Sequence, residues 1–250
     1  MAYLLEIATA DFITTQSAVA GGADRIELCA ALGDGGTTPS LGTIRQCRES
    51  FSLPLFPIIR PRGGDFLYTD EEYNIMLTDV KLCRDLGCDG VVLGLLQSDG
   101  RIDIKRTEAL VKAAYPMEVT FHRAFDRCVD PFEALEKLVE AGVQRILTSG
   151  QKPTAPEGAG LIAELVKAAS ERIIIMPGSG VRTDNIVALA KETGATEFHT
   201  SLRAKQSSHM QYRHPSFADA DFQNPAIHAS DVESVKKLLD ENQGEEKSTE

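Results

Sequence analysis

The sequence contains no apolar run that approaches the roughly 18 residues needed to span a bilayer, and its start lacks the basic stretch of a signal peptide. We therefore expect a cytoplasmic protein. An excess of positive charge is also absent, because the formal net charge is −11. Nucleic acid and anionic membranes favour a basic protein face, so neither is expected as a partner. An anionic ligand would have to be attracted by local groups.

Paired cysteines of the C-x-x-C type are missing as well. An odd number of cysteines without such pairs favours free thiols in a reducing compartment, and it indicates no structural zinc site. The sequence has 5 cysteines, at Cys29, Cys47, Cys83, Cys88 and Cys128.

No linker rich in proline, serine and glycine divides the chain. We therefore expect one domain over residues 1–243, consisting of the main fold and a C-terminal extension. The extension should contain a helix near residues 232–239. Residues 244–250 are charged and short of apolar side chains, which predicts a disordered tail.

Short strand-like runs recur along the chain, and most close on charged or glycine-rich residues. Seven of the eight runs are followed by a segment with helical spacing, which predicts a single-domain α/β protein with the (β/α)8 TIM-barrel fold. A doubly wound sheet is the alternative, but the first turn, at residues 8–11, has no glycine-rich dinucleotide fingerprint. The runs cover residues 4–8, 25–28, 55–59, 90–93, 118–121, 145–148, 173–176 and 197–199.

Helix starts are marked in several places. Thr69-Asp70-Glu71-Glu72 forms a capping box, and Asp130-Pro131 combines a capping side chain with proline at the first helical position. Thr183 is expected to cap a later helix that stops at Gly194.

The alternation of side chains along the strands turns an unusual number of charged groups toward the barrel interior. One interpretation is an internal ion network in which Arg25 or Arg60 neutralises Glu6 and Glu27, because buried charges are costly unless paired. Residues at the C-terminal ends of strands favour function instead, since barrel active sites are assembled there. The residues expected at the C-terminal ends of strands are Glu27, Arg60, His122 and His199.

Two loops contain groups suited to an anion. Arg60 and Arg62 flank a proline and precede Gly63-Gly64, so their guanidinium groups could bind carboxylate or phosphate, although a lid loop tied down by Asp65 is the alternative. The turn Gly178-Ser179-Gly180 could cradle phosphate with backbone amides, or it could simply make a tight turn.

Five sequence runs together resemble the CutC family of copper homeostasis proteins, over about residues 4–213. The resemblance implies a cytoplasmic barrel that is commonly oligomeric, with copper as its associated metal. A homodimer or higher homo-oligomer is expected, since dimers are common among soluble barrels. The segment 207–222, with Met210, Tyr212, His214 and Phe217, could cover a neighbouring copy or the barrel mouth. The runs are GGADRIELC (21–29), GGTTPS (35–40), IRPRGGDF (59–66), TFHRAFD (120–126) and LTSGQ (147–151).

Family members proposed to bind copper have cysteines at the ends of the first two strands, so the resemblance implies Cys29 as a metal ligand here. The first of these positions is Ala8, which has no sulfur. Cys128 is the only other thiol expected at the same rim. Because Cu(I) prefers thiolate and thioether ligands, the missing thiol argues against tight Cu(I) binding within one chain.

Three hypotheses follow: a copper-binding protein, an enzyme acting on a small phosphorylated or carboxylated compound, and a ligand-binding or assembly module without turnover. For the enzyme, His122 would be the general acid/base, with Glu27 or His199 as its partner. A hard divalent metal held by Glu6, Glu27, His122 and Glu197 is a further alternative. The expected anion-binding residues are Arg60, Arg62, Arg123, Ser149, Gly178, Ser179 and Gly180.

Overall fold

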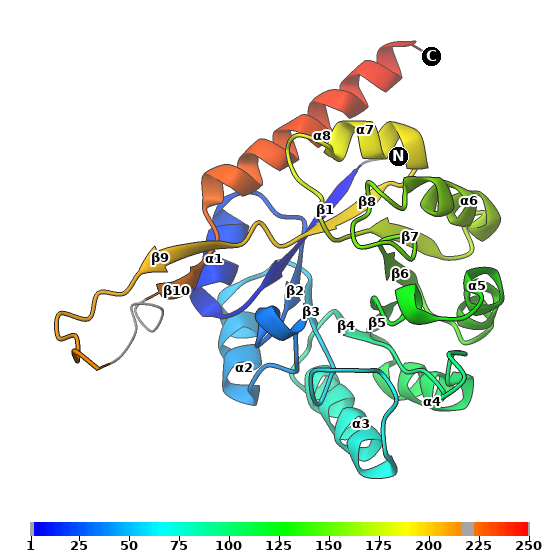
Figure 1. The fold of residues 1–250 in the computed structure, drawn as a ribbon, viewed down its shortest axis with the longest axis horizontal. Helices are drawn as coiled ribbons and strands as arrows, with labels where there is room; N and C mark the ends of the chain where they lie inside the picture. The colour runs from blue at the N-terminus through cyan, green and yellow to red at the C-terminus, as the bar shows by residue number, and fades with distance from the viewer. Residues whose placement is uncertain (1–2, 217–222, 250) are drawn as a thin grey trace.

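Parallel strands form the centre of the molecule, and helices surround them, in a computed structural model that describes residues 3–216 and 223–249 (Figure 1). The strands match the predicted runs to within about two residues. Their bounds are β1 (Leu4–Thr9), β2 (Arg25–Leu28), β3 (Leu55–Pro57), β4 (Gly90–Leu93), β5 (Glu118–Phe121), β6 (Arg145–Thr148), β7 (Ile174–Pro177) and β8 (Glu197–Thr200).

The strands close into a barrel. Hydrogen bonds join them in the orders β3-β2-β1-β8 and β4-β5-β6-β7. A parallel bridge between Ile58 and Val92 links β3 to β4, and β7 packs beside β8. The predicted TIM barrel is therefore confirmed, and the doubly wound sheet is excluded.

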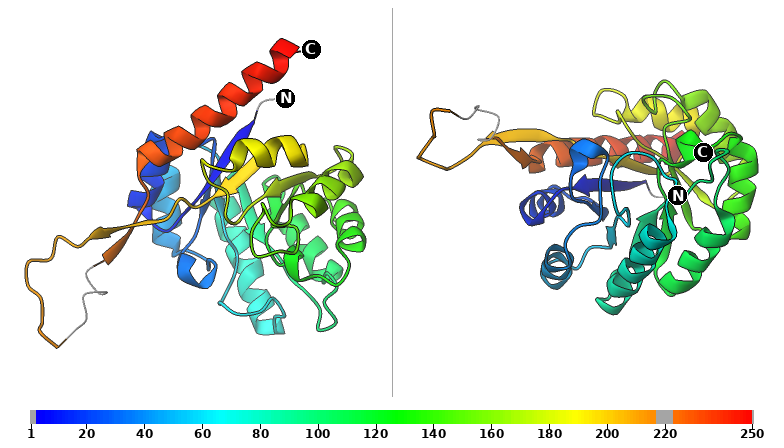
Figure 2. Two further views of the ribbon diagram at one scale, coloured as in Figure 1. Left: turned by 45° about the horizontal axis from the view of Figure 1, so that its top comes forward. Right: turned by 60° about the horizontal axis from the view of Figure 1, so that its bottom comes forward.

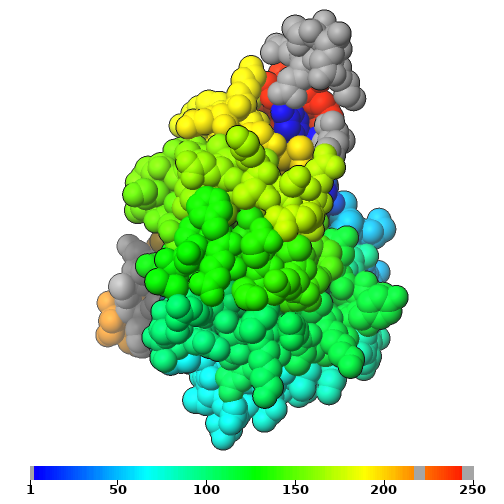
Figure 3. Space-filling view, turned by 90° about the vertical axis from the view of Figure 1, so that its right-hand side faces the viewer, coloured from blue at the N-terminus to red at the C-terminus, as the bar shows by residue number. Residues whose placement is uncertain are grey.

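The helices follow the strands in chain order, so neighbouring βα units are neighbours in space (Figure 3). Short 3-10 turns η1 (Leu32–Asp34) and η2 (Phe125–Arg127) follow β2 and β5. The helices are α1 (Phe12–Ala20), α2 (Leu41–Ser50), α3 (Asp70–Asp85), α4 (Ile104–Ala114), α5 (Pro131–Glu140), α6 (Ala159–Ala169), α7 (Ile186–Thr193) and α8 (Ala229–Thr249).

Two of the three predicted helix starts are confirmed. Thr69 and Glu72 form the capping box of α3, and Asp130 accepts the first backbone N–H groups of α5. Thr183 does not cap α7, which begins at Ile186. The side chain of Asn185 accepts the Arg182 N–H and donates to the Gly180 carbonyl, so these residues form a turn that delays the helix.

Helix α8 is much longer than the predicted segment 232–239 and packs beside α1 and α7. Its buried side chains Val232, Val235 and Leu239 lie three to four residues apart, the spacing of one helix face. The assigned helix continues to Thr249. The expectation of a disordered tail over residues 244–250 stays a prediction.

An antiparallel hairpin of β9 (Ala204–Ser207) and β10 (Gln223–Ala226) projects away from the barrel (Figures 1 and 2). Met210 and Tyr212 beyond β9 are exposed. The described part of segment 207–222 therefore does not cover the mouth, whereas its contact with a neighbouring copy stays a prediction. Phe217 lies outside the described residues. Within the described ranges, no helix has the length and apolar character needed to cross a membrane.

The aromatic ring of Phe56 lies inside the barrel, against two buried arginines. The guanidinium groups of Arg25 and Arg145 lie 5.2 and 5.7 Å from the centre of the Phe56 ring. Gly90 on the neighbouring strand leaves room for this ring, because a Cβ atom there would lie 2.1 Å from a ring carbon of Phe56. The glycine is therefore required by packing.

We expect Gly90→Ala to lower the free energy of unfolding by about 1–3 kcal/mol, because the methyl group would displace the buried Phe56 ring. Gly160→Ala in α6 is the matched control. It has no heavy atom within 4 Å of the added Cβ and should be neutral or stabilising by up to about 1 kcal/mol. Urea unfolding of both variants checks this, and equal stability of the two would contradict the packing argument.

Candidate functional site

A cavity of about 750 Å³ opens at the C-terminal ends of the strands, where barrel active sites lie. Several sequence-predicted residues line it together, from strands far apart in the chain. They are Glu27, Arg60, His122, Arg123, Ser179, Gly180 and His199. We call this cavity the mouth pocket.

Three other residues predicted for the site, Arg62, Ser149 and Gly178, do not line the mouth pocket. Arg62 pairs with Glu72 at 2.5 Å and Asp65 at 3.0 Å and does not line the mouth pocket, so the alternative of a tied-down loop describes it better. Ser149 is buried and accepts a hydrogen bond from Arg123. The Gly178 N–H donates to the Thr148 carbonyl. A Cβ atom at Gly178 would lie 2.4 Å from the Leu147 side chain and 3.2 Å from His199, so this glycine makes room chiefly for Leu147.

His199 is the centre of a buried chain of charged groups. Its Nδ1 lies 2.7 Å from Glu6, which also accepts a hydrogen bond from Arg25 Nε. Its Nε2 lies 3.7 Å from the Glu27 carboxylate at the pocket surface. Ionised Glu6 accepts a hydrogen bond from Nδ1–H, so the proton of the neutral ring resides on Nδ1. The other nitrogen, Nε2, faces Glu27.

Two carboxylates in this chain have opposite pKa shifts. Burial would raise the pKa of Glu6, but the charge of Arg25 and the hydrogen bond from His199 outweigh it and hold that pKa well below the usual range. For Glu27, burial dominates and raises the pKa, although the His199 charge opposes it. Burial lowers the His199 pKa, but the Glu6 hydrogen bond and nearby carboxylates raise it overall. Both members of the Glu27–His199 pair therefore have raised pKa values and lie close together, which suits them to exchanging a proton.

His122 is a neutral hydrogen-bond donor. Burial, with the charge of Arg60 added, lowers its pKa to about 3. The Ala124 backbone N–H donates to Nδ1 at 3.2 Å, so the ring proton resides on Nε2. The role of general acid/base expected from the sequence does not suit this environment, because protonation is disfavoured at neutral pH.

Arg60 is buried without a carboxylate partner among the described residues. Its terminal nitrogens donate to the carbonyls of Asp34, Gly36 and Gly64, and its guanidinium lies 5.1 Å from the Phe66 ring centre. The Phe66 ring lies 4.9 Å from the His122 ring. Within the described ranges, Arg60 Nε and His122 Nε2 are buried and lack any hydrogen-bond partner.

The rim of the mouth pocket carries more arginines. Arg123 binds Asp126 at 2.8 Å, and Asp126 in turn accepts hydrogen bonds from Thr148 and from the Ser149 backbone and hydroxyl. Arg182 and Arg203 also line the pocket, and the described part of the chain places no carboxylate against them. Sequence reasoning missed both. Arg182 directly follows the glycine-rich turn after β7, whereas no motif marks Arg203.

The thiols do not make a copper site. Cys29 is fully buried among Phe56, Ile58 and Val92, and a Cβ atom at Gly36 would lie 3.3 Å from its sulfur. Burial and the Glu27 charge raise the pKa of this thiol well above its usual value, so it is a neutral thiol in the metal-free protein. Cys128 instead lies 3.6 Å from the Gln151 side chain.

A hard divalent cation is not favoured either. Glu197 is bound by Arg25 and Arg145, and Glu6 is bound by Arg25 and His199. Among the residues described, no three His, Cys, Asp or Glu side chains converge in a metal-binding arrangement.

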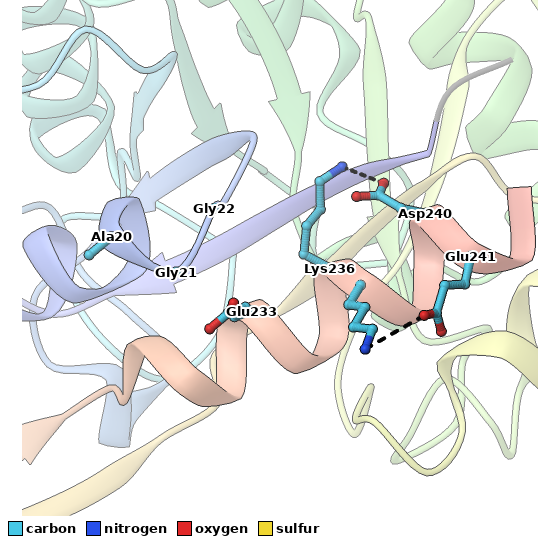
Figure 4. Close-up of a pocket in the computed structure, with 8 residues that line it drawn as sticks. Ala20, Gly21, Gly22, Glu233, Lys236, Asp240 and Glu241 are labelled. Atoms are coloured by element: carbon cyan, nitrogen blue, oxygen red, sulfur yellow. Dashed lines mark hydrogen bonds and ion pairs between the residues drawn. The ribbon is translucent and has the colours of Figure 1, made fainter. Parts of the chain in front are cut away.

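Two further cavities of about 770 and 600 Å³ lie elsewhere among the described residues. One, lined by Arg25, Phe56 and Arg145, is at the opposite end of the barrel. The other is a groove between Gly21-Gly22 and α8, shown in Figure 4. In this groove Lys236 pairs with Asp240, and Lys237 pairs with Glu241. Because these charges are already paired on the outer surface, we favour the mouth pocket as the functional site.

Comparisons with known proteins agree on one family. The sequence model of the CutC family matches residues 3–204. The family protein CutC of Chromobacterium violaceum is 46% identical over 242 residues, which cover 95% of this chain and 98% of that protein. The family protein CutC of Parabacteroides distasonis is 53% identical over 214 residues, covering 85% and 88% of the two chains.

Solved structures give the same result. The crystal structure of a proposed copper homeostasis protein CutC from Streptococcus agalactiae superposes with a TM-score of 0.76 at 34% identity, covering 80% of this chain and 98% of that one. N-(5′-phosphoribosyl)anthranilate isomerase from Pyrococcus furiosus superposes with a TM-score of 0.56 at 12% identity, covering 95% and 98%. At that identity the second likeness shows the fold alone.

The contrast between the two buried histidines predicts separate titrations. Between pH 5 and 8 the His122 imidazole should stay neutral as the Nε2–H tautomer, whereas His199 should lose its proton only above about pH 6.5. Long-range ¹H–¹⁵N NMR of the imidazoles measures both, with His122→Gln and His199→Gln for assignment.

The same shifts fix the signs of the stability changes. Because the His122 pKa is lowered in the folded state, the free energy of unfolding should fall as the pH drops from about 6.5 toward 3. Because the His199 pKa is raised, the stabilisation that it contributes should be lost as the pH rises through that pKa. A His122 ring that titrates near pH 6.5 would contradict this description of the pocket.

Proposed function

This chain belongs to the CutC family, and we propose that its mouth pocket is the site of an enzyme acting on a small phosphorylated or carboxylated metabolite. The observation that carries the proposal is a local excess of positive charge. Arg60, Arg182 and Arg203 line the pocket without a carboxylate partner among the described residues, in a chain of net charge −11. Such guanidinium groups suit carboxylate or phosphate.

The pairing of Glu27 with His199 favours an enzyme over a simple binding module. Both groups line the same pocket as the arginines, they lie 3.7 Å apart, and their raised pKa values suit a proton-transfer role. Arg123 belongs to the same rim, where Asp126 and Ser149 fix its guanidinium. We therefore assign substrate binding to the arginines and proton transfer to Glu27 and His199.

The family name associates this chain with copper, but the pocket residues do not form a set of copper ligands. Cu(I) prefers two or more soft sulfur ligands, and the pocket offers Ala8 where a first thiol would stand. Cys29 is buried beneath Gly36. These residues do not fit a Cu(I) ion, so we assign no copper site. The homodimer or higher homo-oligomer expected from the sequence stays a prediction.

We expect a phosphorylated or dicarboxylated compound to raise the melting temperature of the protein, because a ligand present at 100 times its Kd stabilises the folded state by about 2.7 kcal/mol. Arg182→Ala and Arg203→Ala should each weaken binding about 10- to 100-fold by removing a charge-assisted contact. Arg172→Ala is the matched control, since Arg172 pairs with Glu136 outside the pocket. Thermal shift followed by calorimetric titration measures this. An equal loss in all three variants would refute the assignment.

For copper we expect no dependence on Cys29. Under reducing conditions, Cys29→Ser should leave the affinity for Cu(I) unchanged in competition with a chromophoric chelator, because the buried thiol lacks a second sulfur ligand at Ala8. The copper-binding hypothesis makes the opposite prediction, namely that this substitution abolishes binding. Cys47→Ser, at another buried thiol, controls for general effects on the fold.

A further inference from the structure

Two buried donors of the mouth pocket are left without any acceptor. Arg60 and His122 are each 4% exposed, and both line the pocket. Their Nε and Nε2 atoms have no hydrogen-bond partner among the described residues. A buried polar group without a partner costs about 1–3 kcal/mol, so native structures keep few of them. Acceptor oxygens of a ligand would supply the missing partners.

The protonation states of the two groups define what they can bind. Arg60 Nε always carries a hydrogen. Because the Ala124 N–H occupies Nδ1 of neutral His122, its Nε2 is also a donor. Arg60 Nε and His122 Nε2 are therefore both hydrogen-bond donors that lack an acceptor. A neutral imidazole beside a guanidinium is suited to an oxygen on which negative charge develops during reaction.

The proton-transfer groups lie across the pocket. His122 follows β5, whereas Glu27 and His199 come from β2 and β8, and the closed strand order separates β5 from each of these by two strands. A ligand in the mouth pocket would therefore lie between His122 and the Glu27–His199 pair, with Arg60, which follows β3, beside the strand that carries Glu27. This is the arrangement needed to remove a proton next to a carbonyl group whose oxygen is held by hydrogen bonds.

We infer that the mouth pocket catalyses proton transfer at the carbon next to a carbonyl group of its anionic substrate, as in an isomerisation or epimerisation. This inference rests on the proposed function and names its reaction class. Glu27 takes the proton from carbon, the C–H electron pair forms the C=C bond of an enediolate, and the carbonyl oxygen takes up the negative charge. In an isomerisation the proton returns to the former carbonyl carbon while the hydroxyl proton moves to the former carbonyl oxygen, and in an epimerisation the proton returns to the same carbon on its opposite face. Neither route consumes an oxidant, reductant or co-reactant.

Arg60 and His122 would stabilise the enediolate oxygen, and His199 would act as a positioning residue for Glu27. Phe66 helps to fix the two donors, because its ring packs against both the Arg60 guanidinium and the His122 imidazole. The Tyr68 hydroxyl is a third buried atom without a hydrogen-bond partner in the described chain. Burial raises the Tyr68 pKa and the nearby Arg60 guanidinium opposes this rise, so the hydroxyl lies beside Arg60 and competes with a ligand as its acceptor.

The first test uses phosphoglycolohydroxamate, whose two oxygens reproduce those of an enediolate, against glycerol 3-phosphate, which has the same phosphate and no carbonyl. Calorimetry should give at least 10-fold tighter binding of the hydroxamate to the wild-type protein. His122→Leu should remove this preference, His122→Gln should restore part of it by supplying an N–H donor, and Arg172→Ala, outside the pocket, should retain it. The His122 Nε2–H resonance should move downfield with the hydroxamate only.

The outcomes separate the two levels of the proposal. Equal binding of both compounds, or a preference that persists in His122→Leu, would overturn the oxyanion site and leave anion binding intact. If neither compound binds, the proposed function fails together with this inference. The wild-type comparison alone decides the matter if a variant does not fold.

The second test follows proton transfer itself. In D2O, deuterium should enter next to the carbonyl of at least one compound among dihydroxyacetone phosphate, ribulose 5-phosphate and oxaloacetate, at a rate at least 100-fold above that of Glu27→Gln. The Glu27→Gln variant should still bind the hydroxamate, because it retains both donors. Absence of incorporation from all three compounds, or equal rates in the two proteins, would overturn the reaction class.

Discussion

The interior of this barrel depends on buried ion pairs. Arg25 and Arg145 are each 3% exposed, and both bind Glu197, while Arg25 also binds Glu6. Removing one member of such a group leaves an uncompensated buried charge, which typically costs about 3–5 kcal/mol. The strands that supply these charges are therefore constrained together. Phe56, with both guanidinium groups against its ring, fills the space that an aliphatic layer occupies in other barrels.

The same ion pairs organise the site above them. Glu6 is ionised because Arg25 holds it so, and ionised Glu6 fixes the ring and the tautomer of His199. Glu27 lies only one strand away, yet burial without a dedicated cation raises its pKa. Two neighbouring carboxylates thus differ in their tendency to bind a proton. Such a difference in environment is what allows one carboxylate to have a structural role while the other exchanges protons.

Local sequence patterns were enough to predict the strands, most helix caps and the inward direction of the charged residues, because a two-residue alternation and a capping box depend on neighbours in the chain. The partners of side chains were less accessible. Arg60 and Arg62 stand two residues apart, but only Arg60 reaches the pocket, since Glu72 on α3 binds Arg62. The low pKa of His122 arises from burial and from Arg60, which lies in the loop after β3. Arg203 had no motif to mark it.

Arg60 shows how one side chain can serve the fold and the site together. Its terminal nitrogens are committed to the carbonyls of Asp34, Gly36 and Gly64, which join the loops after β2 and β3. This leaves only Nε unpartnered, beside the neutral His122. Because those carbonyl contacts already immobilise the guanidinium, little reorganisation is needed when charge appears on a bound oxygen. Electrostatic stabilisation is strongest when donors are fixed in advance, so the structural contacts of Arg60 favour its role toward a ligand.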